Sequence, residues 1–229
     1  MKKVSCDICT NNTCLVKKNF TSEWVELLDR GKNMWILGSG TNIFEAGNPI
    51  SGLYFVQNGL IKEYVTGVSN KVEIIRFVSP GCLFGHLGLD KENYLYSAAA
   101  QVESTVCFID NTVLLELFKY DAGFMNDLMK YFSKIYSKNV YRLKCVSQMN
   151  LREKVAEALL YIVEDFGKGG SNELCECFNR EDIASLASTT PEQVSRQLSD
   201  FERESIIEKR GRKIVVLSRE KLKSILEGY

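Results

Sequence analysis

This sequence has little of several features that enzymes depend on. Its 229 residues contain one histidine, His86. No nucleophile–base pair, phosphate-binding glycine loop or group of convergent carboxylates can be traced around it. The sequence therefore predicts that the chain is not an enzyme. We expect His86 to be an ordinary polar residue of a loop or core rather than a metal or haem ligand.

Long apolar runs and net charge are missing too. No apolar stretch approaches the roughly 20 residues that span a bilayer, and the charged N-terminus lacks the apolar core of a signal peptide. We therefore expect a cytoplasmic protein with no membrane partner. The 29 Lys and Arg residues balance 29 Asp and Glu residues. Any binding to nucleic acid must then come from a local basic surface.

Cysteine, in contrast, is abundant, with eight residues. In a reducing compartment such a set indicates metal or redox chemistry before structural disulfides. Cys6, Cys9 and Cys14 follow one another at short spacing in a polar segment, residues 1–20, that can wrap an inorganic site. An iron–sulfur cluster, a zinc ion and a reversible disulfide all suit such thiols, and the spacing does not separate them.

Short apolar runs punctuated by glycine fill the chain from about residue 34 to 110. Many short strands at close spacing predict a β-barrel or sandwich. The runs are 34–37, 53–56, 60–65, 72–78, 98–102 and 106–109.

From about residue 111 the periodicity becomes helical. One set of side chains recurs at spacings that place it on one face of a long helix. This face either packs on the β region or pairs two copies of the chain. The second interpretation is favoured because Leu128, Tyr131 and Ile135 form another stripe for packing, and Asn139 would then set the register of a homodimer. The seam residues are Phe132, Tyr136, Asn139, Leu143 and Val146.

The last 60 or so residues predict a winged helix-turn-helix, preceded by a helix at about 151–166. A short helix starts at Asn179, and Pro191 suits the first position of the next helix. Side chains on that second helix have the chemistry to read base edges, and a basic hairpin at 206–217 can meet phosphates. The candidate DNA contacts are Arg180, Glu192, Gln193, Ser195, Arg196, Lys209, Arg210 and Arg212.

These motifs together resemble the Crp/Fnr family of regulators. The resemblance rests on residues 190–196, on the run from Phe44 to Lys62 and on the segment 80–87. It implies an α+β fold with a β-roll sensor domain like that of cyclic-nucleotide-binding proteins, a long dimerisation helix and a C-terminal winged helix-turn-helix. The expected division is a cysteine-rich arm (1–20), the β-roll (21–122), the dimerisation helix (123–149) and the DNA-binding domain (150–229).

Within the family, Glu192-x-x-Ser195-Arg196 is similar to the FNR branch. That likeness implies double-stranded DNA with TTGAT-like half-sites in a two-fold operator, and RNA polymerase as a further partner. The cyclic-AMP branch binds its phosphate with an Arg, and Tyr96 stands at that position here. Because a cyclic phosphate is best bound by a bidentate guanidinium, which a tyrosine cannot supply, we do not expect cyclic AMP to bind.

The FNR branch also implies a signal. Its oxygen-sensing members bind a 4Fe-4S cluster with an N-terminal cysteine trio and one distant cysteine, which here correspond to Cys6, Cys9, Cys14 and Cys107. The second gap of the trio looks one residue shorter than in the best-known member. The alternatives are zinc, a small effector in the β-roll and thiol oxidation without a cluster. The remaining cysteines are expected to have no ligand role: Cys82, Cys145, Cys175 and Cys177.

Overall fold

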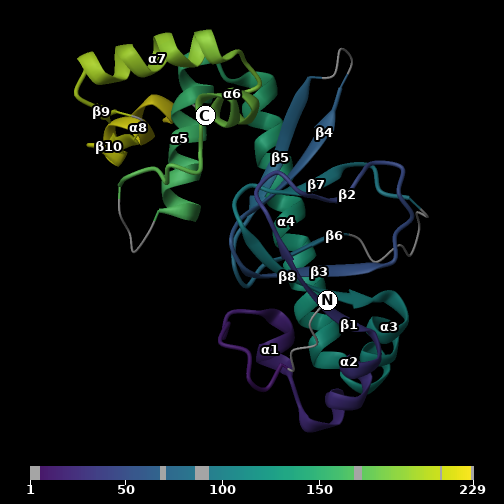
Figure 1. Cartoon of the computed structure of the whole chain (residues 1–229). Helices are drawn as coiled ribbons and strands as arrows, with labels where there is room; N and C mark the ends of the chain where they lie inside the picture. The colour runs from purple at the N-terminus through teal and green to yellow at the C-terminus, as the bar shows by residue number, and fades with distance from the viewer. Residues whose placement is uncertain (1–5, 68–70, 86–92, 168–171, 212, 228–229) are drawn as a thin grey trace. The chain divides into compact units, whose positions relative to one another are not determined.

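The structure is a computed structural model that describes residues 6–67, 71–85, 93–167, 172–211 and 213–227. These residues form two compact units (Figure 1). The N-terminal unit comprises residues 1–71 and 75–136, and the C-terminal unit comprises 72–74 and 137–229. His86 and Arg212, both considered above, lie outside the described residues. In the part of the chain that is described, no helix has the length and apolar character needed to cross a membrane.

Two four-stranded sheets make up the β-rich part, which confirms the predicted β-roll. Each predicted apolar run became a strand, whereas β2 and β6, with three residues each, were not foreseen. In the first sheet the order is β1 (Lys32–Leu37), β8 (Ser104–Asp110), β3 (Gly52–Asn58) and β6 (Leu83–Gly85). In the second it is β2 (Asn42–Phe44), β7 (Ser97–Ala100), β4 (Ile61–Thr66) and β5 (Val72–Val78).

Alternation along β3 and β8 gives the first sheet two different faces. Tyr54 and Val106 point into an aromatic core shared with the second sheet. Phe55, Cys107 and Ile109 point the other way, into a separate cluster covered by helices. Successive side chains of a strand point to opposite faces, so this division follows from the pleat.

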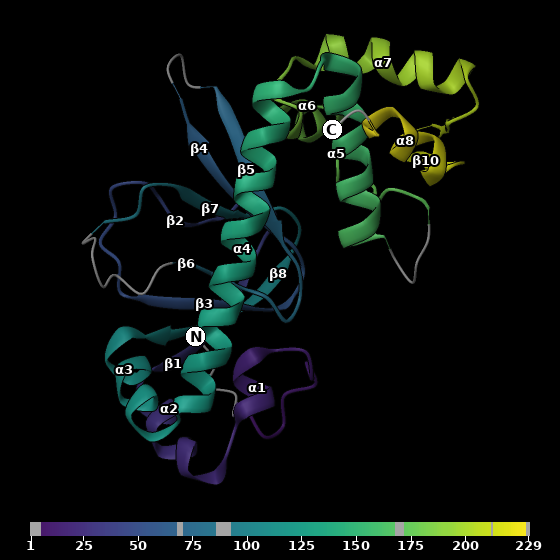
Figure 2. The same ribbon diagram turned by 180° about the vertical axis from the view of Figure 1, so that it is seen from behind.

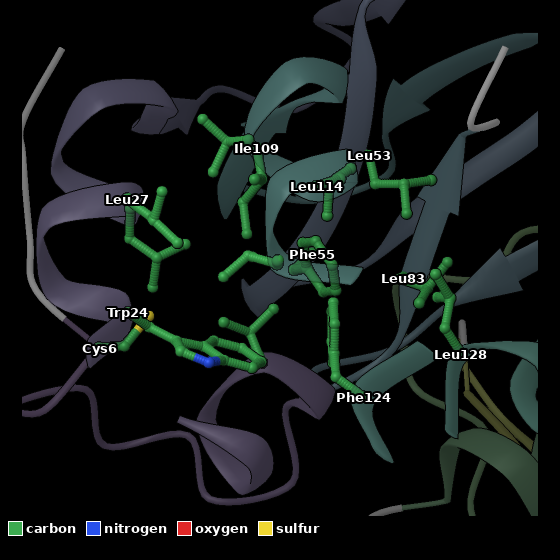
Figure 3. Close-up of a cluster of buried hydrophobic side chains, with 14 residues drawn as sticks. Cys6, Trp24, Leu27, Leu53, Phe55, Leu83, Ile109, Leu114, Phe124 and Leu128 are labelled. Carbon is green, nitrogen blue, oxygen red and sulfur yellow. The ribbon is translucent and has the colours of Figure 1, made fainter. Parts of the chain in front are cut away.

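The helices over that second face close the cluster. They are α1 (Leu15–Asn19), the short 3-10 turn Ser22–Trp24, α2 (Val25–Gly31), α3 (Asn111–Tyr120) and the first part of α4 (Ala122–Gln148). Figures 1 and 2 show α2 and α3 beside β1 and the start of α4. The Trp24 and Phe124 rings meet edge to face with centroids 4.9 Å apart. Figure 3 shows Cys6 and Trp24 among the buried side chains of this cluster.

Local sequence signals set the helix boundaries of the C-terminal unit. A capping box of Asn150 and Glu153 starts α5 (Leu151–Phe166), and one of Asn179 and Asp182 starts α6 (Arg180–Leu186). Each box satisfies backbone N–H groups that a helix start leaves open. Next come α7 (Pro191–Arg203), the hairpin β9 (Ile207–Arg210) and β10 (Lys213–Val216), and α8 (Arg219–Leu226), which was not predicted.

Candidate functional site

Four cysteines line one cavity in the N-terminal unit. Cys6, Cys9 and Cys14 from the arm and Cys107 from β8 surround about 350 Å³ of empty space, which includes its opening to solvent. Cys107 reaches it because β8 turns this side chain to the helix-covered face, opposite Phe55 of β3. The structure thus brings together the four cysteines predicted as ligands.

Asn11 fastens the loop between Cys9 and Cys14 to the sheet. Its Nδ2 donates to the carbonyl oxygens of Val56 and Gln57 at the end of β3, at 3.3 and 3.0 Å. Its Oδ1 accepts from the Thr13 backbone N–H at 3.0 Å. The two bonds to β3 join residues far apart in the sequence, so they hold a polar loop that has little apolar surface of its own to bury.

Two lysines line the cavity as well. Lys32 at the start of β1 is 8% exposed, and its Nζ donates to the Cys6 Sγ at 2.8 Å. Lys17 of α1 donates through Nζ to the carbonyl oxygens of Cys6 and Asp7 at 2.7 and 2.6 Å. Reasoning from sequence missed both, because burial beside a thiol depends on the tertiary pairing of the arm with β1.

Burial governs the protonation of these groups. It raises the pKa of the Cys107 thiol to about 11, against a smaller opposing effect of Lys32, and it raises the pKa of Cys14 as well. For Lys32, burial opposes the charge, but the hydrogen bond and charge of Cys6 outweigh it and the pKa is raised. Without a bound cation, Cys107 therefore stays a protonated thiol at neutral pH.

The donor set fits an iron–sulfur cluster. Thiolates are its usual ligands, commonly four, and none of the eight cysteines, all of them within the described part of the chain, forms a disulfide bond. Among the described residues, no three Cys, His, Asp or Glu side chains lie close enough to share one metal ion. Sulfurs around one zinc ion are about 4 Å apart, given Zn–S bonds of about 2.3 Å. An iron–sulfur cluster is larger than one zinc ion, and its four thiolates are those of Cys6, Cys9, Cys14 and Cys107 if the cavity binds it.

The interior between the two sheets is filled by other side chains. Glu63 is 2% exposed; Arg76 donates to its carboxylate and also to the Leu83 carbonyl oxygen at 3.1 Å. Burial and a hydrogen bond with Glu63 raise the pKa of Tyr96. The residue at the family's phosphate-binding position thus faces a carboxylate, and Arg76 is already paired. An anionic nucleotide would meet repulsion beside Tyr96.

The predicted seam of α4 is largely open to solvent in this single chain. Tyr136 is 71% exposed and Leu143 is 68% exposed, Asn139 is exposed, and Phe132 and Val146 are half-buried. In the other stripe, Leu128 is buried in the helix-covered cluster. An exposed apolar row on a long helix is typical of a protein interface.

The second helix of the helix-turn-helix, α7, has a buried and an open face. Val194, Leu198 and Phe201 are buried as predicted. On the other face, Glu192, Gln193 and Arg196 are exposed, whereas Ser195 is half-buried and donates to the Pro191 carbonyl oxygen. Arg180 of α6 donates to the Ser195 hydroxyl at 3.4 Å, so four of the predicted base-reading residues and Arg180 share one surface.

The wing differs from its prediction in one respect. Lys209 and Arg210 belong to β9 rather than to the tip of the hairpin, and the turn centres on Gly211. Both side chains are paired with acids: Lys209 lies 2.8 Å from Glu202 of α7, and Arg210 lies 2.7 Å from Glu208. Lys209 thereby ties the wing to α7.

Comparison with known proteins decides the family. A model of the Crp-like helix-turn-helix domain matches residues 153–225, and a model of the cyclic nucleotide-binding domain matches residues 36–121. The chain belongs to the Crp/Fnr family. The Crp/Fnr helix-turn-helix makes this chain a DNA-binding transcription regulator that acts as a dimer, and the family is non-enzymatic.

Individual Crp/Fnr proteins resemble the chain over most of its length. Electron transport regulator A of Shewanella oneidensis is 24% identical, and the alignment covers 98% of this chain and 91% of the relative's chain. The fumarate and nitrate reduction regulatory protein of Vibrio cholerae is 25% identical over 80% of this chain and 74% of its own. The structure of FixK2 from Bradyrhizobium japonicum shares the fold, with a TM-score of 0.77, 20% identity and coverage of 85% of this chain and 96% of that one.

Proposed function

We propose that this regulator senses oxygen, or a related oxidant, through a 4Fe-4S cluster bound by Cys6, Cys9, Cys14 and Cys107. The observation that carries the proposal is the single cavity that these four thiols line. When bound, the cluster would supply an oxidant-sensitive link between the arm and the sheet. The names of two relatives, an electron transport regulator and a fumarate and nitrate reduction regulator, agree with respiratory control.

Two rival signals have less support. A structural zinc ion would use the same four thiolates in tetrahedral geometry, but it would be insensitive to oxygen. A small anionic effector in the β-roll would have to displace the Glu63–Arg76 pair and the stacked rings of Phe44 and Tyr94. Thiol oxidation without a metal is left as the second candidate, because the same four cysteines lie around one cavity.

Packing offers a route from the cysteines to the dimer helix. Cys14 is followed at once by α1, whose Val16 is buried with Phe124 and Leu128 of α4. Cys14 and the seam residue Phe132 pack against the same cluster. A cluster that joins Cys14 to Cys107 would hold α1 on this part of α4 and stabilise the dimer seam. Loss of the cluster would release α1, loosen the seam and favour monomers.

On DNA, the dimer would present two α7 helices to successive major grooves one turn apart. Glu192, Ser195 and Arg196 would read TTGAT-like half-sites of a two-fold operator, with Gln193 and Arg180 beside them. Lys209, Arg210 and Arg212 would meet phosphates. The regulator would work in the cytoplasm and contact RNA polymerase.

The test is purification without oxygen followed by exposure to air. We expect a brown protein with about four irons and four sulfides per chain, which bleaches in air and then binds a two-fold operator more weakly. Iron and sulfide assays, visible absorption and gel-shift titration with and without oxygen give the three readouts.

Matched cysteine variants sharpen this test. Cys9→Ala and Cys107→Ala should abolish iron and sulfide binding, whereas Cys82→Ala, outside the cavity in the same unit, should keep both. A colourless protein with one zinc per chain would refute the cluster. A metal-free protein whose DNA binding responds to a disulfide oxidant would favour the thiol switch instead.

A further inference from the structure

One charged side chain in the cysteine cavity has no part in the function proposed so far. Lys32 lies at the first position of β1, where its Cα pairs with Ile109 of β8. This register places it on the helix-covered face, among the side chains that line the cavity. A lysine is almost never as buried as this one, at 8% exposure, unless it is paired.

The partner of Lys32 is a candidate ligand atom. Its Nζ lies 2.8 Å from the Cys6 Sγ, so the ammonium donates directly to sulfur. Lys17, in contrast, reaches only the backbone carbonyls of Cys6 and Asp7. Both lysines line the same cavity, but Lys17 shapes the loop and Lys32 acts on the thiol itself.

We infer that Lys32 is a positioning residue of the cluster site, which orients the Cys6 thiolate and supplies positive charge beside the bound iron–sulfur group. This inference rests on the proposed function. Four thiolates add four negative charges to a largely buried site, and buried charges persist only when they are paired. Groups that hydrogen-bond to ligands orient them and tune the metal. Net charge and hydrogen bonds to the sulfurs set cluster potentials.

The experiment replaces Lys32 in the full-length protein reconstituted anaerobically with ferrous iron and sulfide. Lys32→Met keeps most of the length of the side chain and removes its charge, and Lys32→Arg keeps the charge. Lys18→Met is the control, because Lys18 is an exposed lysine of α1 that does not line the cavity. Iron and sulfide content, the reduction potential and the rate of bleaching in air are measured for each protein.

We expect Lys32→Met to have a more negative reduction potential, because a nearby cation favours the electron-richer state. Its bleaching in air should be about tenfold faster than in the wild type, the lower end of effects seen for groups around metal ligands. Lys32→Arg and Lys18→Met should behave like the wild type.

The contrary outcomes are distinct. If Lys32→Met matches Lys18→Met in potential and bleaching rate, the role of Lys32 is refuted while the cluster stands. If Lys32→Met takes up no iron, the Lys32→Arg variant decides. Normal iron loading and a normal reduction potential in Lys32→Arg would support the role of the positive charge. No iron loading in Lys32→Arg would show that only the shape of lysine matters, and it would refute that role. A wild type without iron and sulfide would refute the proposed function and this inference together.

Discussion

At the scale of single residues, the contact between the cysteine arm and the sheet depends on small side chains and one amide. Asn11 bonds to the end of β3, and Thr13 lies against Gly81 in the turn before β6. Gly81 has φ +87°, which glycine adopts without the penalty that other residues incur. A Cβ on Gly81 would lie 2.0 Å from the Thr13 Oγ1, so this turn has no room for a side chain.

Gly81→Ala should therefore push the arm away from the sheet. We expect it to lose most of its iron and sulfide after anaerobic reconstitution, in addition to a backbone cost of about 1–3 kcal/mol for the left-handed conformation. Iron assays and urea unfolding followed by tryptophan fluorescence measure the two effects, since Trp24 and Trp35 both belong to the N-terminal unit.

Gly40→Ala is the control for Gly81→Ala. Gly40 has a similar φ of +80°, but a Cβ there would contact nothing within 4 Å. It should lower stability to a similar extent through the backbone and leave cluster loading intact. Equal iron loss in both variants would contradict the role given to the Thr13 contact.

At the scale of elements, α7 is anchored to α5 by one arginine. Arg152 forks onto both carboxylate oxygens of Glu204 at 2.9 and 2.6 Å, and its guanidinium lies 4.8 Å from the centre of the Phe201 ring. Both side chains are partly exposed, so solvent screens the pair. The anchor is expected to orient α7 more than to stabilise the fold.

Arg152→Ala should cost about 1 kcal/mol in the unfolding of the C-terminal unit, from the ion pair and the ring contact together. The hydrogen bond from Arg152 lowers the pKa of Glu204 below its usual range. The ion-pair contribution is therefore present above the unfolded pKa of about 4.3 and is lost as pH falls through the lower folded value. Urea unfolding by circular dichroism at pH 7 and pH 3 measures this difference.

Lys223→Ala provides the comparison, because Lys223 makes a single exposed bridge of 3.0 Å to Glu164. Its effect should be smaller at pH 7 than that of Arg152→Ala. If the two variants were equally stable at pH 7, the forked geometry would contribute nothing.

The exposed face of α7 also allows a prediction about how the protein discriminates between DNA bases. Arg196 is exposed on the open face of the helix, and a guanidinium that forks onto guanine typically contributes about 1–3 kcal/mol to discrimination. Arg196→Ala should weaken operator binding by that amount and relax the preference at one base position, as measured by gel-shift titration against single-base operator variants.

Arg203→Ala is the matched control on α7. Arg203 is exposed in the last turn and pairs with Asp200. Its removal should leave base preference unchanged. An equal loss of affinity on every operator variant with Arg196→Ala would mean that Arg196 contacts phosphate rather than bases.

At the scale of the whole molecule, we propose that the dimer of this family covers the exposed apolar row of α4 that includes Tyr136 and Leu143. Leu143 is the predicted seam residue to test, because it is 68% exposed in the single chain. Leu143→Glu would place a charge in the seam, and we expect it to shift the protein from dimer to monomer in sedimentation velocity and to lose binding to a two-fold operator.

Leu95→Glu is the control for the dimer, since Leu95 is equally exposed at 69% but belongs to the segment before β7 and not to α4. It should remain dimeric. A dimeric Leu143→Glu variant would show that the seam lies elsewhere on the surface.

How much the sequence could predict differs between the two units. In the C-terminal unit the helix boundaries depend on caps and on Pro191, which act within one turn, so α5, α6 and α7 were predicted nearly to the residue. In the N-terminal unit the apolar runs predicted six strands. The three-residue strands β2 and β6 carry too short a pattern to stand out, and they form because longer neighbours pair with them.

The sequence by itself indicated the family and the order of its domains, because motifs and periodicity are local properties of the chain, and the resemblance to the FNR branch then pointed to the four cysteines. Only the tertiary structure decided that Cys107 shares a cavity with the arm, since this depends on the register of β8 against β3. Only the tertiary structure could distinguish Lys32, as the lysine that donates to a cysteine sulfur of the cavity, from the other lysines. Burial and a sulfur partner arise when β1 pairs with β8 and the arm folds over them, and no local pattern encodes that meeting.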